Sequence, residues 1–378
     1  MTQTRKTFNL FTISQARSVL FGIATLWIGL FHSDHLSLAP YTDSRFLIGA
    51  FHFFRSIGNV GVDMFLLLSG IGLFFSFSRD GRVLSFWKKR LLRVLPTAFL
   101  IATVYFSFRY VTGRYTSGFS EYFSRMTFTY FFREGERVFW FISLILVLYL
   151  VFPVLYKVIE RYRGPGTVGL VALVVALTMT LRQVAPDTYA NIEIALCRVP
   201  VFIIGIWAGK FVVQKKEVDR RWLWAFLAAA VAALVFLFFF SKIMKALVAG
   251  YDPSEDEIRY IFLYRYASCP LGISLVVLDS YICTALRSRG RCNLLRNFFD
   301  FVGMYSMEYY MIYLNIVHYL ERIYQISPKQ EIMLCFGSFV VSLVLCVLVR
   351  KVCDYFMAYM QRKPVKPDKL SGKTAGGQ

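Results

Sequence analysis

A histidine at the far end of the first apolar segment is the residue in this chain best suited to acid–base chemistry. The segment reads RSVLFGIATLWIGLFHSDH from Arg17 to His35 and ends in two histidines, His32 and His35, which bracket an aspartate. A helix rises about 1.5 Å per residue, so His32 is expected roughly 22 Å from Arg17, most of a bilayer core. A histidine at that depth can accept a proton as a general base. The alternative is an ordinary interfacial histidine whose ring faces water.

Asp63 stands near the start of the second apolar segment, GVDMFLLLSG, where it could assist the histidine. Since this segment is expected to descend from the outer face, Asp63 and His32 are predicted at similar depth on consecutive helices. A carboxylate beside an imidazole fixes its tautomer and raises its basicity. We therefore predict that His32 and Asp63 are catalytic. His35 shares a helical face with His32 and is either a second acid/base or a loop residue.

Basic residues cluster at the start of the third apolar segment, in FWKKRLLRVLP at 86–96. Arg90 and Arg93 are three residues apart, so both are expected on one helical face at the level of the lipid headgroups. Two guanidinium groups in this geometry suit an anionic diphosphate, which they can bind through bidentate hydrogen bonds. With Lys88 and Lys89 beside them, they predict a phosphate site. The alternative is that these charges only orient the chain in the membrane.

Other polar residues within apolar segments are candidates for structural or functional roles. Arg198 and Glu308 are both predicted near mid-membrane, and we expect them to pair with each other as structural support. Ser69 belongs to the small-residue run LLSGIG, which predicts close helix packing. Trp140 and Ser143, both in WFISLILVLY, are further candidates for the site.

Composition indicates which elements must position these residues. The 378 residues are 57% hydrophobic and 18% aromatic with a mean hydropathy of +0.53, and the apolar residues come in long runs, as in polytopic membrane proteins. The net charge of +20 would suit nucleic acid, but the basic residues lie between the apolar runs. The seven cysteines form no metal-ligand pattern. We expect neither a nucleic-acid partner nor a metal.

Apolar stretches of about 20 residues predict an all-α polytopic membrane protein with about ten transmembrane helices. They are expected at 17–35, 60–78, 94–111, 138–157, 167–184, 192–212, 222–247, 260–282, 298–319 and 332–355. Most of the 43 Lys and Arg residues fall on the side of the N-terminus, so the positive-inside rule predicts that both termini are cytoplasmic. The predicted regions are a cytoplasmic N-terminal segment (1–16), a single transmembrane domain (17–355) and a disordered cytoplasmic tail (356–378).

Six stretches, taken in order, resemble the integral-membrane acyltransferase 3 family. They are GIATLWIGLFH (22–32), GVDMFLLLSG (61–70), FWKKRLLRVLP (86–96), WFISLILVLYLVFP (140–153), RVPVFIIGIWAG (198–209) and YSMEYYMIYL (305–314). Each stretch alone is a weak signal, but the ordered set covers nearly the whole chain. The family moves acyl groups, usually acetyl, from cytoplasmic acyl-CoA to acceptors such as cell-envelope glycans.

The resemblance implies roles for individual residues. The family's proposed base corresponds to His32, and its basic motif corresponds to Arg90 and Arg93. The family's arginine eleven residues before the histidine would fall on Phe21, so Arg17, one turn earlier on the same face, is expected to take its role.

The activity implied is that of an acyl-CoA-dependent O-acyltransferase in the inner membrane of a cell. The expected donor is acyl-CoA, with acetyl-CoA as the simplest case, and Arg17 and Lys89 are expected to help Arg90 and Arg93 bind it. The expected acceptor is a hydroxyl of an extracytoplasmic glycan or lipid-linked glycan. Tyr313 departs from the family, since many members carry histidine at this position. Membrane lipids are the other expected partner, and an oligomer is compatible with the sequence.

The competing class is a transporter or flippase for a polar envelope precursor, in which buried charges would line a substrate path. Discontinuous helices and duplicated halves are typical of such proteins. Prolines interrupt or begin several predicted helices, at Pro96, Pro153, Pro200 and Pro270, but no internal duplication accompanies them.

Overall fold

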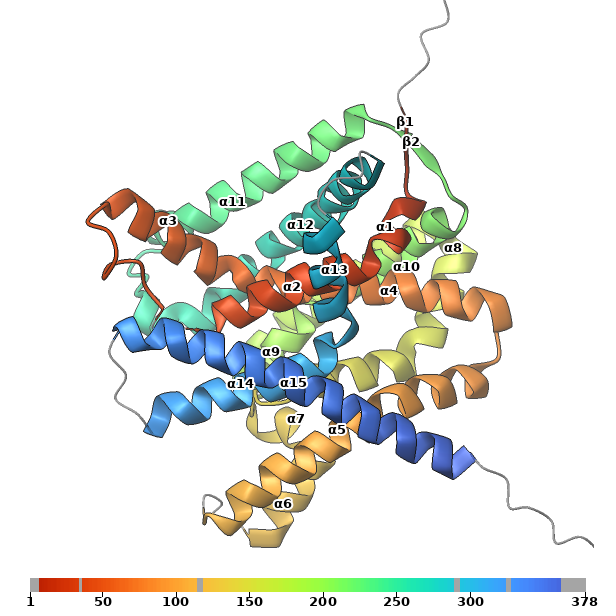
Figure 1. Cartoon of the computed structure of the whole chain (residues 1–378). Helices are drawn as coiled ribbons and strands as arrows, with labels where there is room; N and C mark the ends of the chain where they lie inside the picture. The colour runs from red at the N-terminus through yellow and green to blue at the C-terminus, as the bar shows by residue number, and fades with distance from the viewer. Residues whose placement is uncertain (1–6, 34–35, 114–117, 289–292, 324–327, 362–378) are drawn as a thin grey trace, which may run out of the picture.

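The computed structural model describes residues 7–33, 36–113, 118–288, 293–323 and 328–361, so the candidate His35 lies outside the described residues. Helices make up nearly all of this chain (Figure 1). In order, the elements are β1 (Thr7–Asn9), α1 (Phe11–Gln15), α2 (Arg17–Phe31), α3 (Arg45–Ser56), a short 3-10 helix (Ile57–Asn59), α4 (Val60–Asp80), α5 (Val83–Val111), α6 (Gly118–Met126), α7 (Tyr130–Glu134), α8 (Trp140–Val184), α9 (Pro186–Leu196), α10 (Val199–Val213), β2 (Glu217–Asp219), α11 (Arg221–Leu247), α12 (Pro253–Ser288), α13 (Asn293–Met304), α14 (Ser306–Ile323) and α15 (Pro328–Gln361).

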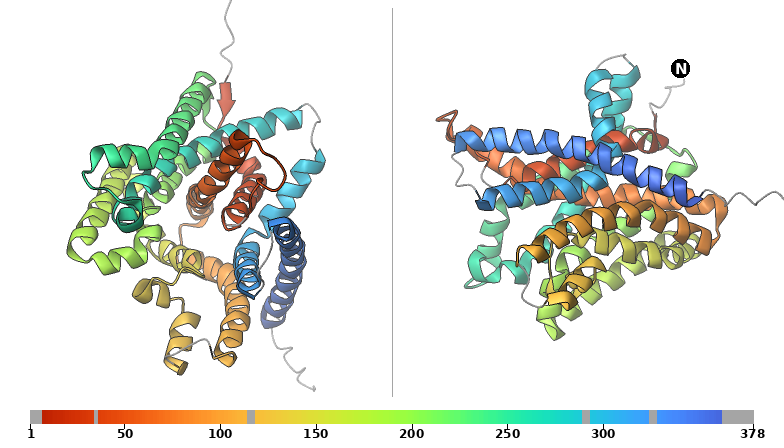
Figure 2. Two further views of the ribbon diagram at one scale, coloured as in Figure 1. Left: turned by 90° about the vertical axis from the view of Figure 1, so that its left-hand side faces the viewer. Right: turned by 60° about the horizontal axis from the view of Figure 1, so that its bottom comes forward.

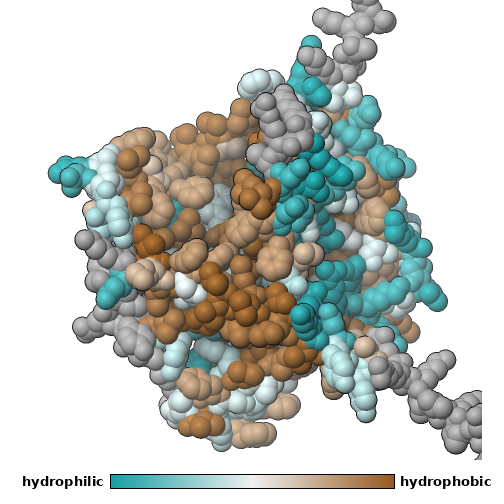
Figure 3. All heavy atoms as spheres, viewed as in Figure 1, coloured by the Kyte–Doolittle hydropathy of each residue, from teal (hydrophilic) through white to brown (hydrophobic). Residues whose placement is uncertain are grey.

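The predicted class, an all-α membrane protein, is confirmed. Within the described residues, seven helical stretches are long and apolar enough to cross a membrane, and α2 is a shorter apolar helix beside them. Apolar side chains cover the middle of the face shown in Figure 3, whereas hydrophilic ones gather along its right-hand edge. Such a surface fits a lipid environment with one strongly polar end. The count of ten helices and the cytoplasmic location of the termini stay predictions.

Two predicted helices, 138–157 and 167–184, lie together in α8, and the chain turns sharply between them. At Arg163 the backbone has φ 53° and ψ −130°, which is not helical. A Cβ on Gly166 would stand only 3.1 Å from the carbonyl oxygen of Val158, although eight residues of straight helix would separate these positions by roughly 12 Å. The chain therefore bends back on itself here, and the predicted helices form the two arms of α8.

The small residues of LLSGIG allow the close helix contact that the sequence predicted. Any Cβ on Gly70 of α4 would stand 2.5 Å from the carbonyl oxygen of Phe202 on α10, closer than real Cβ contacts. The absence of a side chain at Gly70 is what lets the two backbones approach. Gly72, two residues on, makes room for a side chain instead, because a Cβ there would meet the Arg17 guanidinium at 2.5 Å.

Helix α2 occupies the interior of the bundle, where it packs on α4, α13 and α14. The end-on view in Figure 2 shows α2 with α11 and α12 on one side and α14 and α15 on the other. Near the N-terminus, β1 pairs antiparallel with β2, Phe8 opposite Val218. This pairing puts the N-terminal segment and the α10–α11 connection on the same side of the molecule, as the predicted topology requires.

Candidate active site

His32 caps the C-terminal end of α2 and lines a large cavity. Its backbone N–H donates to the carbonyl oxygen of Ile28 at 3.1 Å, and its side chain is partly exposed. The cavity has a volume of about 1140 Å³, and most of its lining residues are apolar. Because small-molecule pockets usually measure roughly 300–1,000 Å³, this cavity can hold more than a simple metabolite. His32 therefore lies at a cavity with room for a ligand of considerable size.

The polar groups of the cavity come from several helices that are distant in sequence. They are His32, Ser56, Asn59, Arg109, Arg137, Arg198, Ser241, Arg265 and Asn315, with Trp140, Tyr105, Tyr251, Tyr264 and Tyr319 among the aromatic residues. Of the residues predicted from sequence, His32, Trp140 and Arg198 thus share one cavity. The guanidinium of Arg198 also lies over the Trp140 ring, 5.5 Å from its centroid, in a cation–π contact.

The structure does not support the predicted partnership of Asp63 with His32. Asp63 is fully buried on α4, where the Ser268 hydroxyl donates to its Oδ2 at 2.9 Å and Arg198 Nε lies 3.5 Å from its Oδ1. The sequence predicted a depth for Asp63 but could not tell which way its side chain points around the helix axis. Asp63 compensates a buried arginine, and this contact makes it a supporting residue rather than a partner of the imidazole.

The predicted pair of Arg198 and Glu308 is wrong for the same reason. Arg198 is 1% exposed and bonds to the carbonyl oxygen of Asn59 at 3.2 Å besides contacting Asp63. Glu308, on α14, is paired instead with Arg350 of α15, whose Nε donates to Oε1 at 2.6 Å. Both groups do find an opposite charge, as burial requires, but in different helices.

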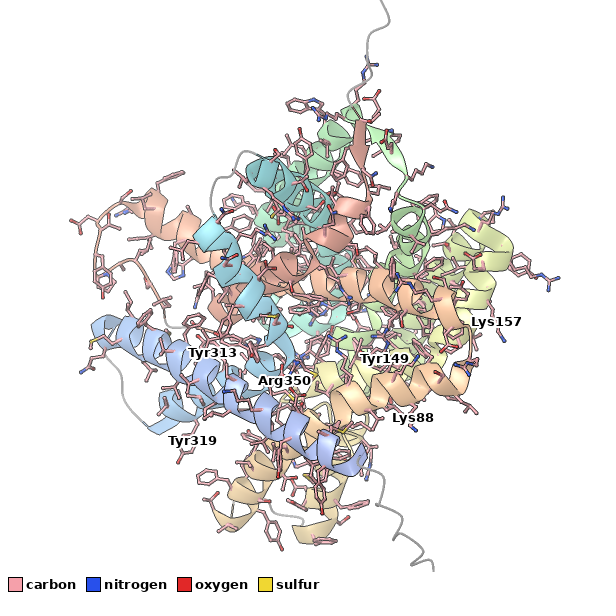
Figure 4. All side chains as sticks on the ribbon, turned by 45° about the vertical axis from the view of Figure 1, so that its right-hand side comes forward. Lys88, Tyr149, Lys157, Tyr313, Tyr319 and Arg350 are labelled. Atoms are coloured by element: carbon pink, nitrogen blue, oxygen red, sulfur yellow. The ribbon has the colours of Figure 1, made fainter. Side chains whose placement is uncertain are left out.

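A second cluster surrounds the other end of α2. Arg17, Arg90, Arg93 and Tyr149 lie close enough to interact electrostatically. Figure 4 shows Tyr149 further inside the bundle than Lys88 and Lys157, which lie toward its end. Among the described residues, no carboxylate pairs with Arg17, Arg90 or Arg93, so three positive charges meet here without a protein counter-charge.

Arg17 contacts Phe21, the residue that stands where the family carries an arginine. Its guanidinium lies over the Phe21 ring at 5.1 Å from the centroid and fits beside Gly72 of α4. Phe21 is in turn stacked on Phe65, with 5.0 Å between centroids. A phenyl ring one turn from the arginine thus supports its charge, and the role expected for Arg17 stays a prediction.

Lys89, predicted as a further phosphate ligand, faces a different group. Its ammonium lies 3.2 Å from Oδ2 of Asp80, the last residue of α4. Asp80 also accepts from Arg82 and Ser85, which together tie the α4–α5 connection. Lys89 therefore has a local structural contact that Arg90 and Arg93 do not have.

The remaining candidates have packing roles in the structure. The buried Ser143 hydroxyl donates to the carbonyl oxygen of Phe128 at 2.8 Å, and Phe128 has the unusual φ of 58°, so this bond supports a strained turn. The Tyr313 hydroxyl lies 3.1 Å from the hydroxyl of Ser33, the residue that follows His32 in the sequence. Tyr313 thus packs on the C-terminal end of α2. Ser69 is half-buried on α4 and lies outside the cavity lining.

One charged group that contacts two arginines of the cavity wall was not predicted from the sequence. Glu193 of α9 is 1% exposed and accepts from Arg265 of α12 at 2.5 and 2.9 Å and from Arg137 at 3.0 Å. The available signal was a single carboxylate inside the apolar stretch 192–212 and a single arginine inside 260–282. Among the described residues, no group of His, Cys, Asp and Glu side chains is arranged to hold a metal ion.

This helical fold with a large internal cavity is that of a membrane protein, and comparison with known families defines its class. A family model described as an acyltransferase domain, that of the acyltransferase 3 family, matches residues 20–351. The chain belongs to this family and is a membrane acyltransferase, as its six motifs predicted. Searches for similar curated proteins and for similar solved structures found no match.

The contact between Asp63 and Arg198 predicts coupled effects on stability. Asp63→Asn and Arg198→Met should each lower the free energy of unfolding by about 3–5 kcal/mol, because each leaves a buried polar partner uncompensated. The double variant should lose less than the sum of the two, which is measured as a non-additive change in thermal stability of the detergent-purified protein.

The matched control is the pair that the sequence suggested. Arg198→Met combined with Glu308→Gln should give additive losses, since these groups have separate partners. Additivity between Asp63 and Arg198, together with coupling between Arg198 and Glu308, would contradict the structure.

Proposed function

We propose that this enzyme transfers an acyl group, acetyl in the simplest case, from cytoplasmic acyl-CoA to a hydroxyl of an extracytoplasmic glycan or lipid-linked glycan. The observation that carries the proposal is the pair of sites at the two ends of α2. One end bears a cluster of arginines that has no carboxylate partner among the described residues, and the other presents His32 to a large cavity. The proposed location is the inner membrane of the cell, with the arginine cluster facing the cytoplasm.

The donor site follows from the charges around Arg17, Arg90 and Arg93. Like charges held together are unfavourable unless an anion joins them, and the diphosphate of CoA supplies negative charge in a form that guanidinium groups bind well. The Nε atoms of Arg17 and Arg90 are buried without a hydrogen-bond partner, so they have donors left for a ligand. These features support Arg17, Arg90 and Arg93 as the nucleotide-binding residues, with Lys89 contributing only at their edge.

The distance between the two sites suits an acyl chain carried on a long arm. Leu100, on α5, lines the cavity and follows Arg93 by a rise of roughly 10 Å along the helix. Ile28, on α2, lines it as well, roughly 16 Å from Arg17. A donor whose phosphates bind the arginines can therefore extend its pantetheine arm along these helices into the cavity.

In the proposed reaction, the His32 imidazole removes the proton from the acceptor hydroxyl as its oxygen attacks the thioester carbonyl carbon. A carbon–oxygen bond forms, the carbon–sulfur bond breaks, and the proton passes from His32 to the departing CoA sulfur. The thioester is already activated, so no covalent enzyme intermediate is needed. Transport alone would need neither a base in the cavity nor an acyltransferase domain, and the family assignment favours the enzyme.

Removing the base should abolish transfer without disturbing the fold. We expect His32→Gln to lower the rate of transfer from radiolabelled acetyl-CoA by about 10²–10⁴-fold, the usual contribution of a general base. The measurement uses purified protein with an envelope glycan fraction as acceptor. His52→Gln is the matched control, because His52, on α3, bonds to Ser37 and lies outside the cavity lining. A near-normal rate for His32→Gln would eliminate this mechanism.

The donor site predicts an effect that depends on the nucleotide. Arg90→Ala with Arg93→Ala should raise the KM for acetyl-CoA by at least about tenfold, the loss expected for charged hydrogen bonds. The same variant should match the normal enzyme when acetylpantetheine, which lacks the nucleotide, is the donor.

Lys157→Ala controls for the loss of a positive charge at this end of the molecule, since Lys157 is exposed nearby on α8 (Figure 4). It should leave the KM for acetyl-CoA unchanged. If the arginine variant kept its KM for acetyl-CoA, the cluster would have no part in donor binding.

A further inference from the structure

The cavity wall contains more positive than negative charge at one place. Arg198 is paired with Asp63, and Arg265 is paired with Glu193 through two hydrogen bonds of 2.5 and 2.9 Å. Arg137 is the third arginine that contacts these carboxylates, because its Nη2 donates to the same Glu193 at 3.0 Å. Three arginines therefore share two carboxylates, and one positive charge remains uncompensated within this group.

The uncompensated charge lies on the arginine that a ligand can reach. The side chains of Arg265 and Glu193 are 7% and 1% exposed, whereas that of Arg137 is 50% exposed, and both Arg137 and Arg265 line the cavity. Glu193 already has both oxygens bound by Arg265, so it occupies only one N–H of Arg137. The other N–H groups of this planar fork are available at the cavity wall.

The neighbouring charges do not neutralise Arg137. Arg125 pairs with Glu121 and Glu136, and Arg109 lies 3.5 Å from Glu136, so two arginines are matched by two carboxylates. Burial raises the pKa of Glu136 above its ordinary value, against the opposing effect of Arg125. Arg109 and Arg125 both contact Glu136, so this carboxylate is already shared by two arginines other than Arg137. The local excess of positive charge therefore persists around the outer part of the cavity.

We propose that Arg137, supported by Arg265 and Glu193, binds an oxyanion carried by the acceptor, either a carboxylate or a phosphate. The acceptor is then an acidic or phosphorylated saccharide rather than a neutral one. A guanidinium binds either oxyanion through two parallel hydrogen bonds, and an anion in this apolar surrounding supplies the missing counter-charge. The inference rests on the proposed function, since it specifies the acceptor that shares the cavity with His32.

The test compares three small probes on the full-length, detergent-purified protein without any donor. The probes are methyl glucoside, glucuronate and glucose 1-phosphate, and binding is measured by isothermal titration. The normal protein should bind at least one of the anionic probes about tenfold more tightly than methyl glucoside, as expected for a charged hydrogen-bonded contact. Tighter binding of glucuronate assigns the oxyanion to a carboxylate, and tighter binding of glucose 1-phosphate assigns it to a phosphate.

Two variants assign the preference to Arg137. Arg137→Gln should remove it, and Arg137→Lys should retain part of it because the charge is kept. Arg133→Gln is the matched control, an exposed arginine on α7 outside the cavity lining, and it should behave as the normal protein does. Equal binding of all three probes to the normal protein, or an anion preference that survives in Arg137→Gln, would overturn the inference.

Acyl transfer is measured separately, with radiolabelled acetyl-CoA and the same acceptors. Anion binding that depends on Arg137, without any transfer, would refute the proposed function and leave the anion site in place. Equal transfer to neutral and anionic acceptors, in both the normal protein and Arg137→Gln, would support the function and overturn the anion site.

Discussion

Charge buried in an apolar bundle must be compensated, and this constraint accounts for the buried ion pairs that join distant helices in the structure. The compensated pairs are Asp63 with Arg198, Glu193 with Arg265 and Glu308 with Arg350. Each pair joins helices that are distant in sequence, so the same contacts that neutralise charge also fix how the helices pack. Some arginines do not have a carboxylate of their own. Arg17, Arg90 and Arg93 lack a carboxylate among the described residues, and Arg137 shares one, so a bound anion is expected at both places.

Helix α2 runs from the arginine cluster to the cavity, and its length and its neighbouring helices fix this position. Its 15 residues cover roughly 22 Å, short for a membrane-crossing helix, so both of its ends lie within the protein. Gly72 gives Arg17 its space at one end, and Tyr313 packs beside Ser33 at the other. A histidine and an arginine on one rigid helix keep a fixed separation, which suits a reaction whose donor and acceptor enter from opposite sides.

Hydropathy and helical periodicity predicted much of this arrangement from the sequence. The stretch 222–247 is matched by Arg221–Leu247, and Arg17 lies near Arg90, although its replacement of an arginine expected at Phe21 stays a prediction. Which charged side chains pair with each other could not be predicted from the sequence. Arg198 and Glu308 were placed at similar depth, but depth does not say which way a side chain points around its helix. The contacts of Glu193 with arginines far away in sequence depend on how whole helices pack.

The central claim is that one protein joins a donor on one side of a membrane to an acceptor on the other. It is tested most directly in sealed vesicles that contain the purified protein in one orientation. Radiolabelled acetyl-CoA is supplied only on the side that carries the N-terminus, and an acidic glycan acceptor only on the opposite side. Labelled acceptor should appear on the far side while CoA stays with the donor. Label transfer only when donor and acceptor share one side would contradict it.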